Sequence, residues 1–183
     1  GEPNLGERGL AAVPGRETDA RNIIDEAIEY SVRIHCKNIH VIAGKTQRTP
    51  DAEETFQKNL TYAAQKASNH GKTILIEPLN LLDNPGYHLS TLYEALVTLE
   101  AVNHPSLKIM FDCYHLQIMQ GDLLQRLQKH LPKIGHIQFA NAPGRTEPDK
   151  GEINFPWLFT EIDRIGWNGF LGAEYIPQDR TEE

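Results

Sequence analysis

Short apolar runs alternate along the chain with longer segments whose apolar residues recur at helical spacing. Ile24, Ala27 and Ile28 fall on one face of a helix, and the apolar run that follows at 39–43 suits a buried strand. The same order repeats to the end of the chain. Strands are predicted at 39–43, 73–76, 107–111, 134–139 and 170–175, and helices at 18–32, 49–71, 91–102, 122–131 and 154–166. Because strands and helices alternate throughout, the pattern predicts βα units and a parallel sheet.

Polar residues at the starts of the helical segments support these boundaries. Thr18, Thr49 and Asn154 suit the N-cap position, and Thr91 with Glu94 has the spacing of a capping box. Each of these side chains can accept a hydrogen bond from a backbone N–H that lacks a partner in the first helical turn.

A parallel sheet of this kind is either an open, doubly wound sheet or part of a barrel. No predicted strand is followed by a GxGxxG or GxxxxGK[ST] loop, which are the usual nucleotide-binding signals of open sheets. This absence favours the barrel. A complete (β/α)8 barrel has eight units and typically about 250 residues. Residues 1–183 are therefore predicted to form a single domain, an incomplete (β/α)8 TIM barrel with about five βα units, from which the first strands and the last helix are absent.

Charge and composition exclude several classes of protein. The 183 residues include 18 Lys and Arg against 25 Asp and Glu, a formal net charge of -7, which argues against a basic nucleic-acid-binding domain. No window approaches the roughly 18 apolar residues of a membrane span, and the first residues lack the apolar segment of a secretion signal. With only two cysteines far apart, we expect a soluble cytoplasmic protein without disulfides.

Four consecutive predicted strands end in a side chain with an oxygen donor. Because side chains alternate along a strand, Ile76 takes the outer face and Glu77 the inner face at the carboxyl end. The same parity directs Asp112, Gln138 and Glu174 inward at the ends of the next three strands.

Three carboxylates buried together need a counter-charge, because like charges in a low-dielectric site cannot all stay ionised. Three carboxylates and one amide carbonyl form an all-oxygen set, which suits Mg²⁺ or Mn²⁺ better than a zinc site of Cys and His. Taken singly, each acid could instead cap the following helix or form a salt bridge at the barrel mouth. Four such residues in phase favour the metal site.

The residues around these four positions resemble a known family. The blocks are ILIEPLN around Glu77, IMFDCYHLQIMQG around Asp112, GHIQFANAPGRTEPDKGEINFPWLF around Gln138 and Arg145, and FLGAEYIP around Glu174. Together they resemble the hydroxypyruvate isomerase family, within the xylose-isomerase-like group of TIM barrels. The opening segment ERGLAAVPGR resembles the stretch that precedes the fourth βα unit of that family. The likeness therefore runs nearly end to end, without the family's first three strands and final helix.

The resemblance implies roles for individual residues. The metal ligands would be Glu77, Asp112, Gln138 and Glu174. In the wider group the third ligand is a histidine. The hydroxypyruvate isomerase branch resembles this chain in having a glutamine there, so Gln138 favours that branch over a ketose epimerase. Glu77 and Glu174 would also form the acid/base pair. His115 and Arg145 would hold the substrate.

The implied reaction suits these residue types. Hydroxypyruvate and 2-hydroxy-3-oxopropanoate (tartronate semialdehyde) interconvert when a proton moves between adjacent carbons through an enediolate. One carboxylate removes the carbon-bound proton and another group returns it, while a divalent metal acidifies that proton and stabilises the developing charge. The planar guanidinium of Arg145 matches the two oxygens of a substrate carboxylate. The predicted function is thus a metal-dependent isomerase for a small hydroxy-keto acid.

Other functions stay open at this point. An epimerase of the same barrel group would act on a substrate without a carboxylate for Arg145. An endonuclease-IV-like phosphodiesterase would need more His ligands and a basic surface. A barrel without three of its strands has two open sheet edges, so the chain could also be an inactive fragment that acts only as a binding module. The sequence does not determine the oligomeric state, a homo-oligomer included.

Several further residues have no assigned role. His40 and His136 have the inner parity of their strands, where a pocket residue and a satisfied core histidine are equally good interpretations. Glu147 and Glu152 lie in the loop of Arg145, where a solvated charged loop is the simpler interpretation. Alternation directs Cys113 to the outer face, which argues against a thiol nucleophile.

Overall fold

A computed structural model describes residues 7–178, which contain one parallel sheet of five strands. The strands are β1 (Asn38–His40), β2 (Thr73–Ile76), β3 (Leu107–Asp112), β4 (Ile134–Phe139) and β5 (Leu171–Ala173). Their spatial order is their order along the chain, and every neighbouring pair is parallel. A doubly wound sheet reverses its strand order at a switch point, whereas a barrel adds each strand beside the last. The prediction of an incomplete barrel is therefore confirmed.

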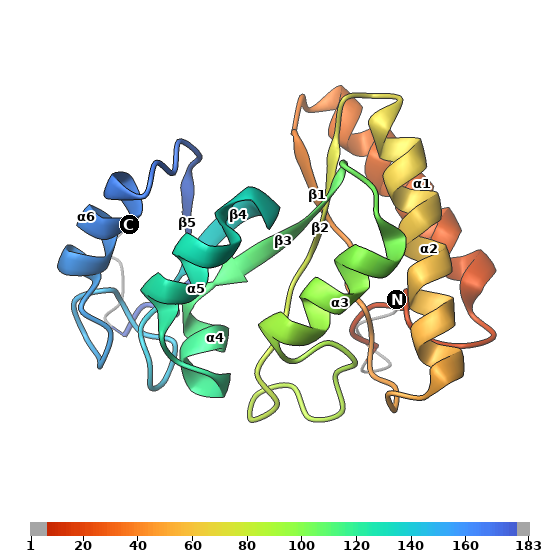
Figure 1. Cartoon of the computed structure of the whole chain (residues 1–183). Helices are drawn as coiled ribbons and strands as arrows, with labels where there is room; N and C mark the ends of the chain where they lie inside the picture. Colours follow the sequence, from red (N-terminus) through yellow and green to blue (C-terminus); the bar gives the residue numbers. More distant parts are fainter. Residues whose placement is uncertain (1–6, 179–183) are drawn as a thin grey trace.

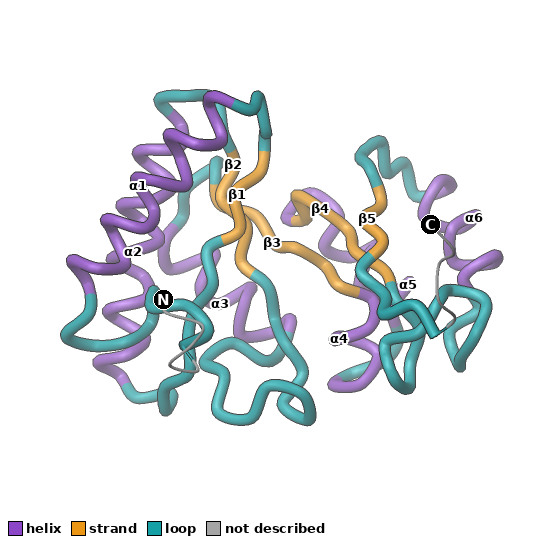
Figure 2. The backbone as a smooth tube through the Cα atoms, turned by 180° about the vertical axis from the view of Figure 1, so that it is seen from behind, coloured by secondary structure: helices purple, strands orange, loops and turns teal. Residues whose placement is uncertain are grey.

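The helices flank the curved sheet, as Figures 1 and 2 show from opposite sides. They are α1 (Glu17–Arg33), α2 (Pro50–Ser68), α3 (Leu92–Val102), α4 (Cys113–Met119), α5 (Leu123–His130) and α6 (Phe155–Arg164), with a short 3₁₀ helix at Leu131–Lys133. Helices α1, α2 and α3 gather at the β1–β2 end of the sheet, and α5 and α6 at the β4–β5 end (Figure 1). Among residues 7–178, no helix combines the length and apolar character that crossing a bilayer requires.

Outward-facing strand residues form the core between the sheet and the helices. The fully buried ones are Ile74, Ile76, Ile109, Phe111 and Ile137. Phe56 and Leu60 of α2 are equally buried and belong to the same apolar cluster. Burial of a side chain of this size contributes about 1.5–3 kcal/mol to the stability of the folded state. The alternation read from the sequence thus fixes which strand face meets the helices.

The segments that follow the strands gather at one edge of the sheet, the lower edge in Figure 1. Asp112, the last residue of β3, pairs in register with Gln138 of β4. Phe139 at the end of β4 pairs with Ala173 at the end of β5. The carboxyl ends of neighbouring strands therefore lie level, so the residues that end them lie close together.

Three helices begin where the capping residues predicted. Thr49 accepts a hydrogen bond from Ala52 N, Asn154 accepts one from Trp157 N, and Thr91 with Glu94 forms both bonds of a capping box. The predicted cap at Thr18 is wrong, because α1 already begins at the preceding residue and has no side-chain cap. The acidic residues in its first turn, Glu17 and Asp19, instead stabilise the helix by interacting with the positive end of its dipole.

Helix α4 was not predicted. It begins at Cys113, directly after β3, because Asp112 acts as its N-cap and accepts a hydrogen bond from the backbone N–H of Tyr114 at 2.7 Å. The strand alternation therefore ends at Asp112, but Cys113 still lies on the side predicted for it, in the apolar cluster between the sheet and the helices and not among the residues that line the cavity. Its side chain is fully buried, and burial raises the pKa of the thiol, which still argues against a nucleophile.

The capping box of α3 is expected to have a measurable effect on stability. Thr91→Ala removes the hydroxyl that accepts from Glu94 N at 3.2 Å, and should lower the free energy of unfolding by about 1 kcal/mol. Urea unfolding followed by circular dichroism measures the change. Thr160→Ala is the matched control: its hydroxyl bonds only to Pro156 O within α6, so an equal loss in the control would contradict the role of the cap.

Candidate active site

A cavity of about 750 Å³ opens at the carboxyl edge of the sheet. Of the residues predicted to carry chemistry, its lining includes His40, Glu77, His115, Gln138, Arg145 and Glu174. These residues come from five different segments of the chain, each at or after the end of a strand or in the loop beyond it. The cavity is therefore assembled by the sheet, as expected for an active site of a barrel.

Glu77 and Asp112 form the buried acidic part of the site. Glu77 follows β2 and is 5% exposed, and Asp112 ends β3 and is 0% exposed. Because Oδ1 of Asp112 caps α4, only Oδ2 is left to face the cavity residues. Asp112 thus caps the following helix with one oxygen, while its other oxygen points toward His115 and Arg145.

Burial strongly disfavours the ionised forms of both acids. It raises the pKa of Glu77 to about 9, and the negative charges of Asp112 and Glu174 add to the shift. Burial also raises the pKa of Asp112 to about 6, against the hydrogen bond from Tyr114 N, which lowers it. The pair thus holds a proton at neutral pH unless a cation compensates its charge.

Three oxygen atoms at this site are buried without a hydrogen-bond partner. They are Oε1 of Glu77, Oδ2 of Asp112 and Oε1 of Gln138. They come from the ends of β2 and β3 and from β4, where Gln138 lies directly beside Asp112 in register. Buried polar atoms are nearly always paired, so three unpaired acceptors in one place indicate a site for a positively charged group.

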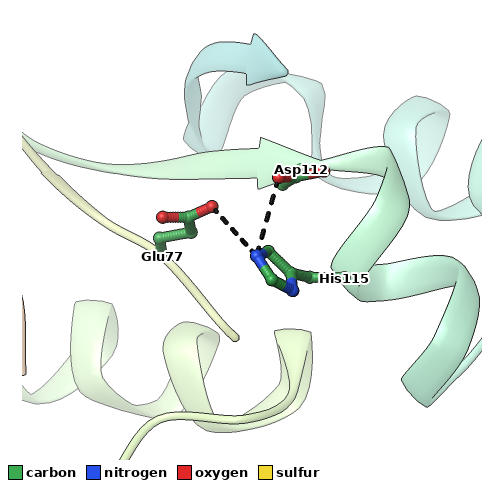
Figure 3. Close-up of side chains that lie close together, drawn as sticks. All are labelled: Glu77, Asp112 and His115. Carbon is green, nitrogen blue, oxygen red and sulfur yellow. Dashed lines mark ion pairs between the residues drawn. The ribbon is translucent and has the colours of Figure 1, made fainter. Parts of the chain in front are cut away.

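The orientation of His115 is fixed by the loop after β2. Its Nδ1 accepts a hydrogen bond from the backbone N–H of Asn80 at 3.2 Å, so the neutral ring carries its proton on Nε2. Burial lowers the pKa of His115 to about 4, which keeps the ring neutral. Nε2 lies 4.0 Å from Glu77 Oε1 and 3.8 Å from Asp112 Oδ2 (Figure 3). His115 therefore presents a hydrogen-bond donor, although the three residues also lie close enough to share an ion.

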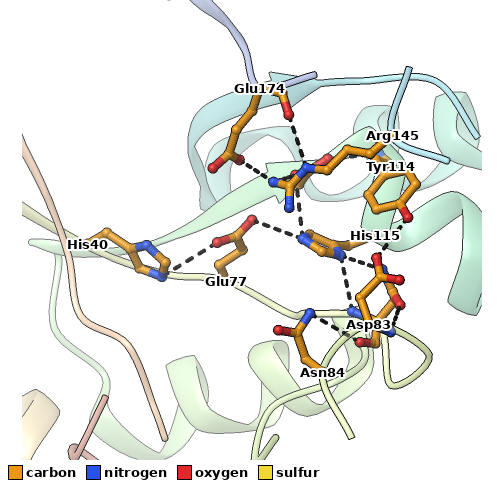
Figure 4. A network of polar contacts seen from close by, with 10 residues as sticks. His40, Glu77, Asp83, Asn84, Tyr114, His115, Arg145 and Glu174 are labelled. Atoms are coloured by element: carbon orange, nitrogen blue, oxygen red, sulfur yellow. Dashed lines mark hydrogen bonds and ion pairs between the residues drawn. The ribbon is translucent and has the colours of Figure 1, made fainter. Parts of the chain in front are cut away.

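Arg145 joins the two sides of the site. Its Nη2 lies 2.8 Å from Oε2 of Glu174 and 3.7 Å from Oδ2 of Asp112, and its Nε donates to the backbone carbonyl of Glu174 at 3.0 Å. Figure 4 shows the guanidinium between Glu174 and His115. Glu174 is the most exposed of the predicted acids, with 47% of its side chain accessible. The predicted residues thus converge, with Glu174 at the rim and Glu77 and Asp112 at the base.

Comparison with known proteins agrees with this architecture. A family model described as xylose isomerase-like TIM barrel matches residues 2–183. The chain belongs to that family. The 2-oxo-tetronate isomerase of Cupriavidus necator is 44% identical over 184 residues, which cover 99% of this chain and 71% of the relative. The hydroxypyruvate isomerase of Escherichia coli K12 is 40% identical over 185 residues, which cover 100% of this chain and 72% of the relative.

A solved structure has the same fold at similar identity. The Brucella melitensis protein described as an AP endonuclease, family 2, is 40% identical, with a TM-score of 0.95 over 98% of this chain and 70% of that protein. The chain thus spans roughly 70% of the length of these family members. The curated relatives are isomerases, so the expectation of an isomerase of this barrel family is confirmed at that level.

The residues that had no assigned role lie in different places in the structure. His40 lines the cavity of this barrel, with its Nε2 buried and 3.6 Å from Oε2 of Glu77. His136 is not among the cavity-lining residues. Glu147 accepts a hydrogen bond from Gln178 N, and Glu152 accepts one from the side chain of Gln117. These bonds connect the loop after β4 to the segment after β5 and to α4.

Sequence reasoning missed three residues that support the site. Asn80, Asp83 and Tyr114 form a hydrogen-bonded chain between the loop after β2 and α4. Two of them stand inside the blocks that resemble the family, ILIEPLN and IMFDCYHLQIMQG, where they were quoted but given no role. Only their position in space distinguishes them from the polar residues of any loop.

Proposed function

We propose that this protein interconverts hydroxypyruvate and 2-hydroxy-3-oxopropanoate through an enediolate. The observation that carries the proposal is that unpaired oxygens and positively polarised groups meet at one cavity. The oxygens belong to Glu77, Asp112 and Gln138. Facing them are the guanidinium of Arg145 and the Nε2–H of His115. The names of the curated relatives support the same type of reaction. Two free cysteines and a small-molecule substrate suit the cytoplasm.

We further propose that Glu77, Asp112, Gln138 and Glu174 hold Mg²⁺ or Mn²⁺. The donor set is all oxygen, and three of its atoms are buried without partners, so a hard divalent cation would satisfy them. When bound, the ion would polarise the carbonyl oxygen and the neighbouring hydroxyl oxygen of the substrate and so acidify the proton on the hydroxyl-bearing carbon. His115 is outside this set, because its proton lies on the nitrogen that faces the carboxylates.

The proton transfers are proposed for the two glutamates. Glu174, at the accessible rim, removes the proton from C3 of hydroxypyruvate, and Glu77 returns a proton to C2. The proton of the hydroxyl on C3 passes to the oxygen on C2, directly or through water, so that C3 becomes the aldehyde and C2 the hydroxyl-bearing carbon, and exchange with solvent restores the protonation states of the two glutamates. His115 donates a hydrogen bond from its Nε2–H to the oxygen on which negative charge develops, and keeps its proton.

Arg145 is proposed to bind the substrate carboxylate. Its guanidinium lines the cavity and presents several N–H groups in one plane, of which Nε and Nη2 contact Glu174. A carboxylate that approaches the remaining N–H groups would lie beside the acid/base pair. This arrangement favours a carboxylic acid over a neutral sugar, which distinguishes the proposal from a ketose epimerase.

A second candidate substrate is 2-oxo-tetronate, which has one more carbon and the same 2-oxo-3-hydroxy acid group. The 44% identity to the Cupriavidus necator enzyme favours it, and the cavity of about 750 Å³ has room for either acid. A phosphodiesterase acting on nucleic acid fits less well, because the site consists mainly of oxygen donors and the chain has a net charge of -7.

Proton NMR in deuterated buffer tests the proposal directly. The chain is incubated with Mg²⁺ and, in separate samples, hydroxypyruvate, 2-oxo-tetronate or a ketohexose. Metal-dependent conversion of an acid, with deuterium incorporated at the carbon that receives the proton, is the expected result. A chelator should abolish it. Conversion of the ketohexose alone would replace the proposal with the epimerase alternative.

Absence of any reaction has a defined follow-up. The assay is repeated with the chain extended at its N-terminus to the length of its relatives. Recovery of activity would mean that the present chain is inactive by itself, in agreement with the fragment alternative. Continued absence of reaction would contradict the substrate assignment.

A further inference from the structure

A polar network outside the proposed acid/base and metal residues centres on Asp83, in the loop between β2 and α3 (Figure 4). One carboxylate oxygen of Asp83, Oδ2, accepts two hydrogen bonds: one from Nδ2 of Asn80 at 2.9 Å and one from the hydroxyl of Tyr114 at 2.7 Å. The backbone N–H of Asp83 donates back to Oδ1 of Asn80 at 2.9 Å. Asn80 is thereby held from both ends of its amide.

The Asn80 branch of the network ends on His115. Asn80 is fully buried, its backbone N–H donates to Nδ1 of His115, and its Nδ2 lies 2.7 Å from the same nitrogen. With Oδ1 accepting from Asp83, Nδ2 has one proton for Asp83 and one for His115. Both contacts favour the tautomer in which the proton of His115 lies on Nε2, toward Glu77 and Asp112.

The Tyr114 branch ends on Arg145. The guanidinium carbon lies 5.5 Å from the centre of the Tyr114 ring, a cation–π contact. The hydrogen bond to Asp83 fixes the far end of that ring. The carboxylate of Asp83 therefore restrains both Asn80, which contacts His115, and Tyr114, which contacts Arg145.

We propose that Asp83 is a positioning residue for the isomerase site, which rests on the function proposed above. Through Asn80 it keeps the Nε2 proton of His115 directed at the substrate oxygen. Through Tyr114 it fixes the ring that makes the cation–π contact with Arg145. The hydrogen bonds from Asn80 and Tyr114 favour the carboxylate form and lower the pKa of Asp83, so the acceptor is ionised across the neutral range. Asp83 itself is not among the residues that line the cavity, so it acts through its neighbours.

The test uses Asp83→Asn, which keeps the size of the side chain and removes its charge. Hydrogen bonds to an ionised group are the stronger ones, so kcat/KM for the acid substrate should fall about 10- to 100-fold. Because Arg145 contacts the substrate carboxylate, part of the loss should be a higher KM. Asp163→Asn, at an exposed residue of α6, is the matched control and should leave both constants unchanged.

Two further measurements separate positioning from general damage to the fold. Nitrogen NMR of His115 should give a pyrrole-like Nε2 and a pyridine-like Nδ1 in the wild type, and an increased share of the other tautomer in Asp83→Asn. Tyr114→Phe removes only the hydroxyl, so it should raise KM without changing the nitrogen shifts of His115 as much. Thermal unfolding of each variant checks that the fold is retained.

The outcomes distinguish this inference from the proposed function. Unchanged His115 shifts and unchanged kcat/KM in Asp83→Asn, beside an active wild type, would overturn the role of Asp83. A wild type that converts neither acid, even after extension to the length of its relatives, would contradict the proposed function, while the nitrogen shifts would still decide whether Asp83 controls the tautomer. A variant that loses activity and stability together, with its tautomer unchanged, would assign Asp83 a purely structural role and also overturn the inference.

Discussion

Glu174→Gln is expected to lower kcat for the isomerisation of hydroxypyruvate by about 10³-fold, because general acid–base catalysis typically contributes 10²–10⁴-fold. The amide keeps the size of the side chain and its contact with Arg145, but it cannot accept the carbon-bound proton. Deuterium exchange into unreacted substrate, followed by proton NMR, measures proton removal separately from product formation. Both should be lost in the variant.

Glu54→Gln is the matched control, because Glu54 is exposed on α2 and pairs only with Lys58 one turn away. This substitution should leave the rate unchanged. If Glu174→Gln still exchanged deuterium at the wild-type rate and lost only product formation, Glu174 would return the proton and Glu77 would remove it. Full activity in the variant would eliminate Glu174 from the acid/base pair.

The stability of the metal-free protein is expected to fall as the pH rises from 7 to 9. Glu77 has a pKa of about 9 in the folded state against an ordinary value of 4.5, so the folded protein holds a proton that the unfolded chain has released. Stability from this group is complete below pH 4.5 and is lost as the pH approaches 9. For one proton the loss between pH 7 and pH 9 is roughly 2 kcal/mol.

In this pH window Glu77 gives most of the expected change, and the buried thiol of Cys113, whose pKa burial also raises, adds a smaller decrease that the Glu77→Gln variant retains. His40 and His115, whose pKa values burial lowers to about 4, are neutral in the folded state and mostly neutral in the unfolded chain above pH 7. Asp112, at about 6, is mostly ionised there. Urea unfolding at pH 7, 8 and 9 in the presence of a chelator measures the slope.

The variant and the metal provide opposite controls for this result. Glu77→Gln cannot ionise, so the decrease attributable to Glu77 should disappear. Mg²⁺ should raise stability most at pH 9, because a bound cation favours the ionised carboxylates. An equal pH dependence in the wild type and Glu77→Gln would contradict the pKa of Glu77, and no effect of Mg²⁺ or Mn²⁺ at any pH would contradict the metal site.

Much of the fold follows from short-range patterns. Apolar spacing located all five strands, and Thr49, Thr91 and Asn154 marked helix starts, because caps and periodicity depend on neighbours along the chain. Helix α4 was not predicted because it gives no separate short-range signal in the sequence. It has seven residues and follows β3 without a turn, so its start depends on Asp112 accepting a hydrogen bond rather than on a break in the pattern.

The candidate site was predictable as a set of residues but not as an arrangement. Parity placed Glu77, Asp112 and Gln138 on the inner face at the strand ends, and the sequential strand order brings these ends together. The supporting contacts of Asp83 and Tyr114 had no signal in the sequence, because hydrogen bonds between residues 31 positions apart leave no periodic trace.

The sequence by itself determined the alternation of strands and helices, the inner and outer strand faces, and the identity of the polar residues at the strand ends. These depend on the repeat of the backbone, which is 3.6 residues in a helix and two in a strand. Only the tertiary structure decided the charge and proton states. The pKa of Glu77, the Nε2 proton of His115 and the pairing of Arg145 with Glu174 depend on distances of a few ångströms between segments far apart in the chain, and electrostatic energies change steeply over such distances.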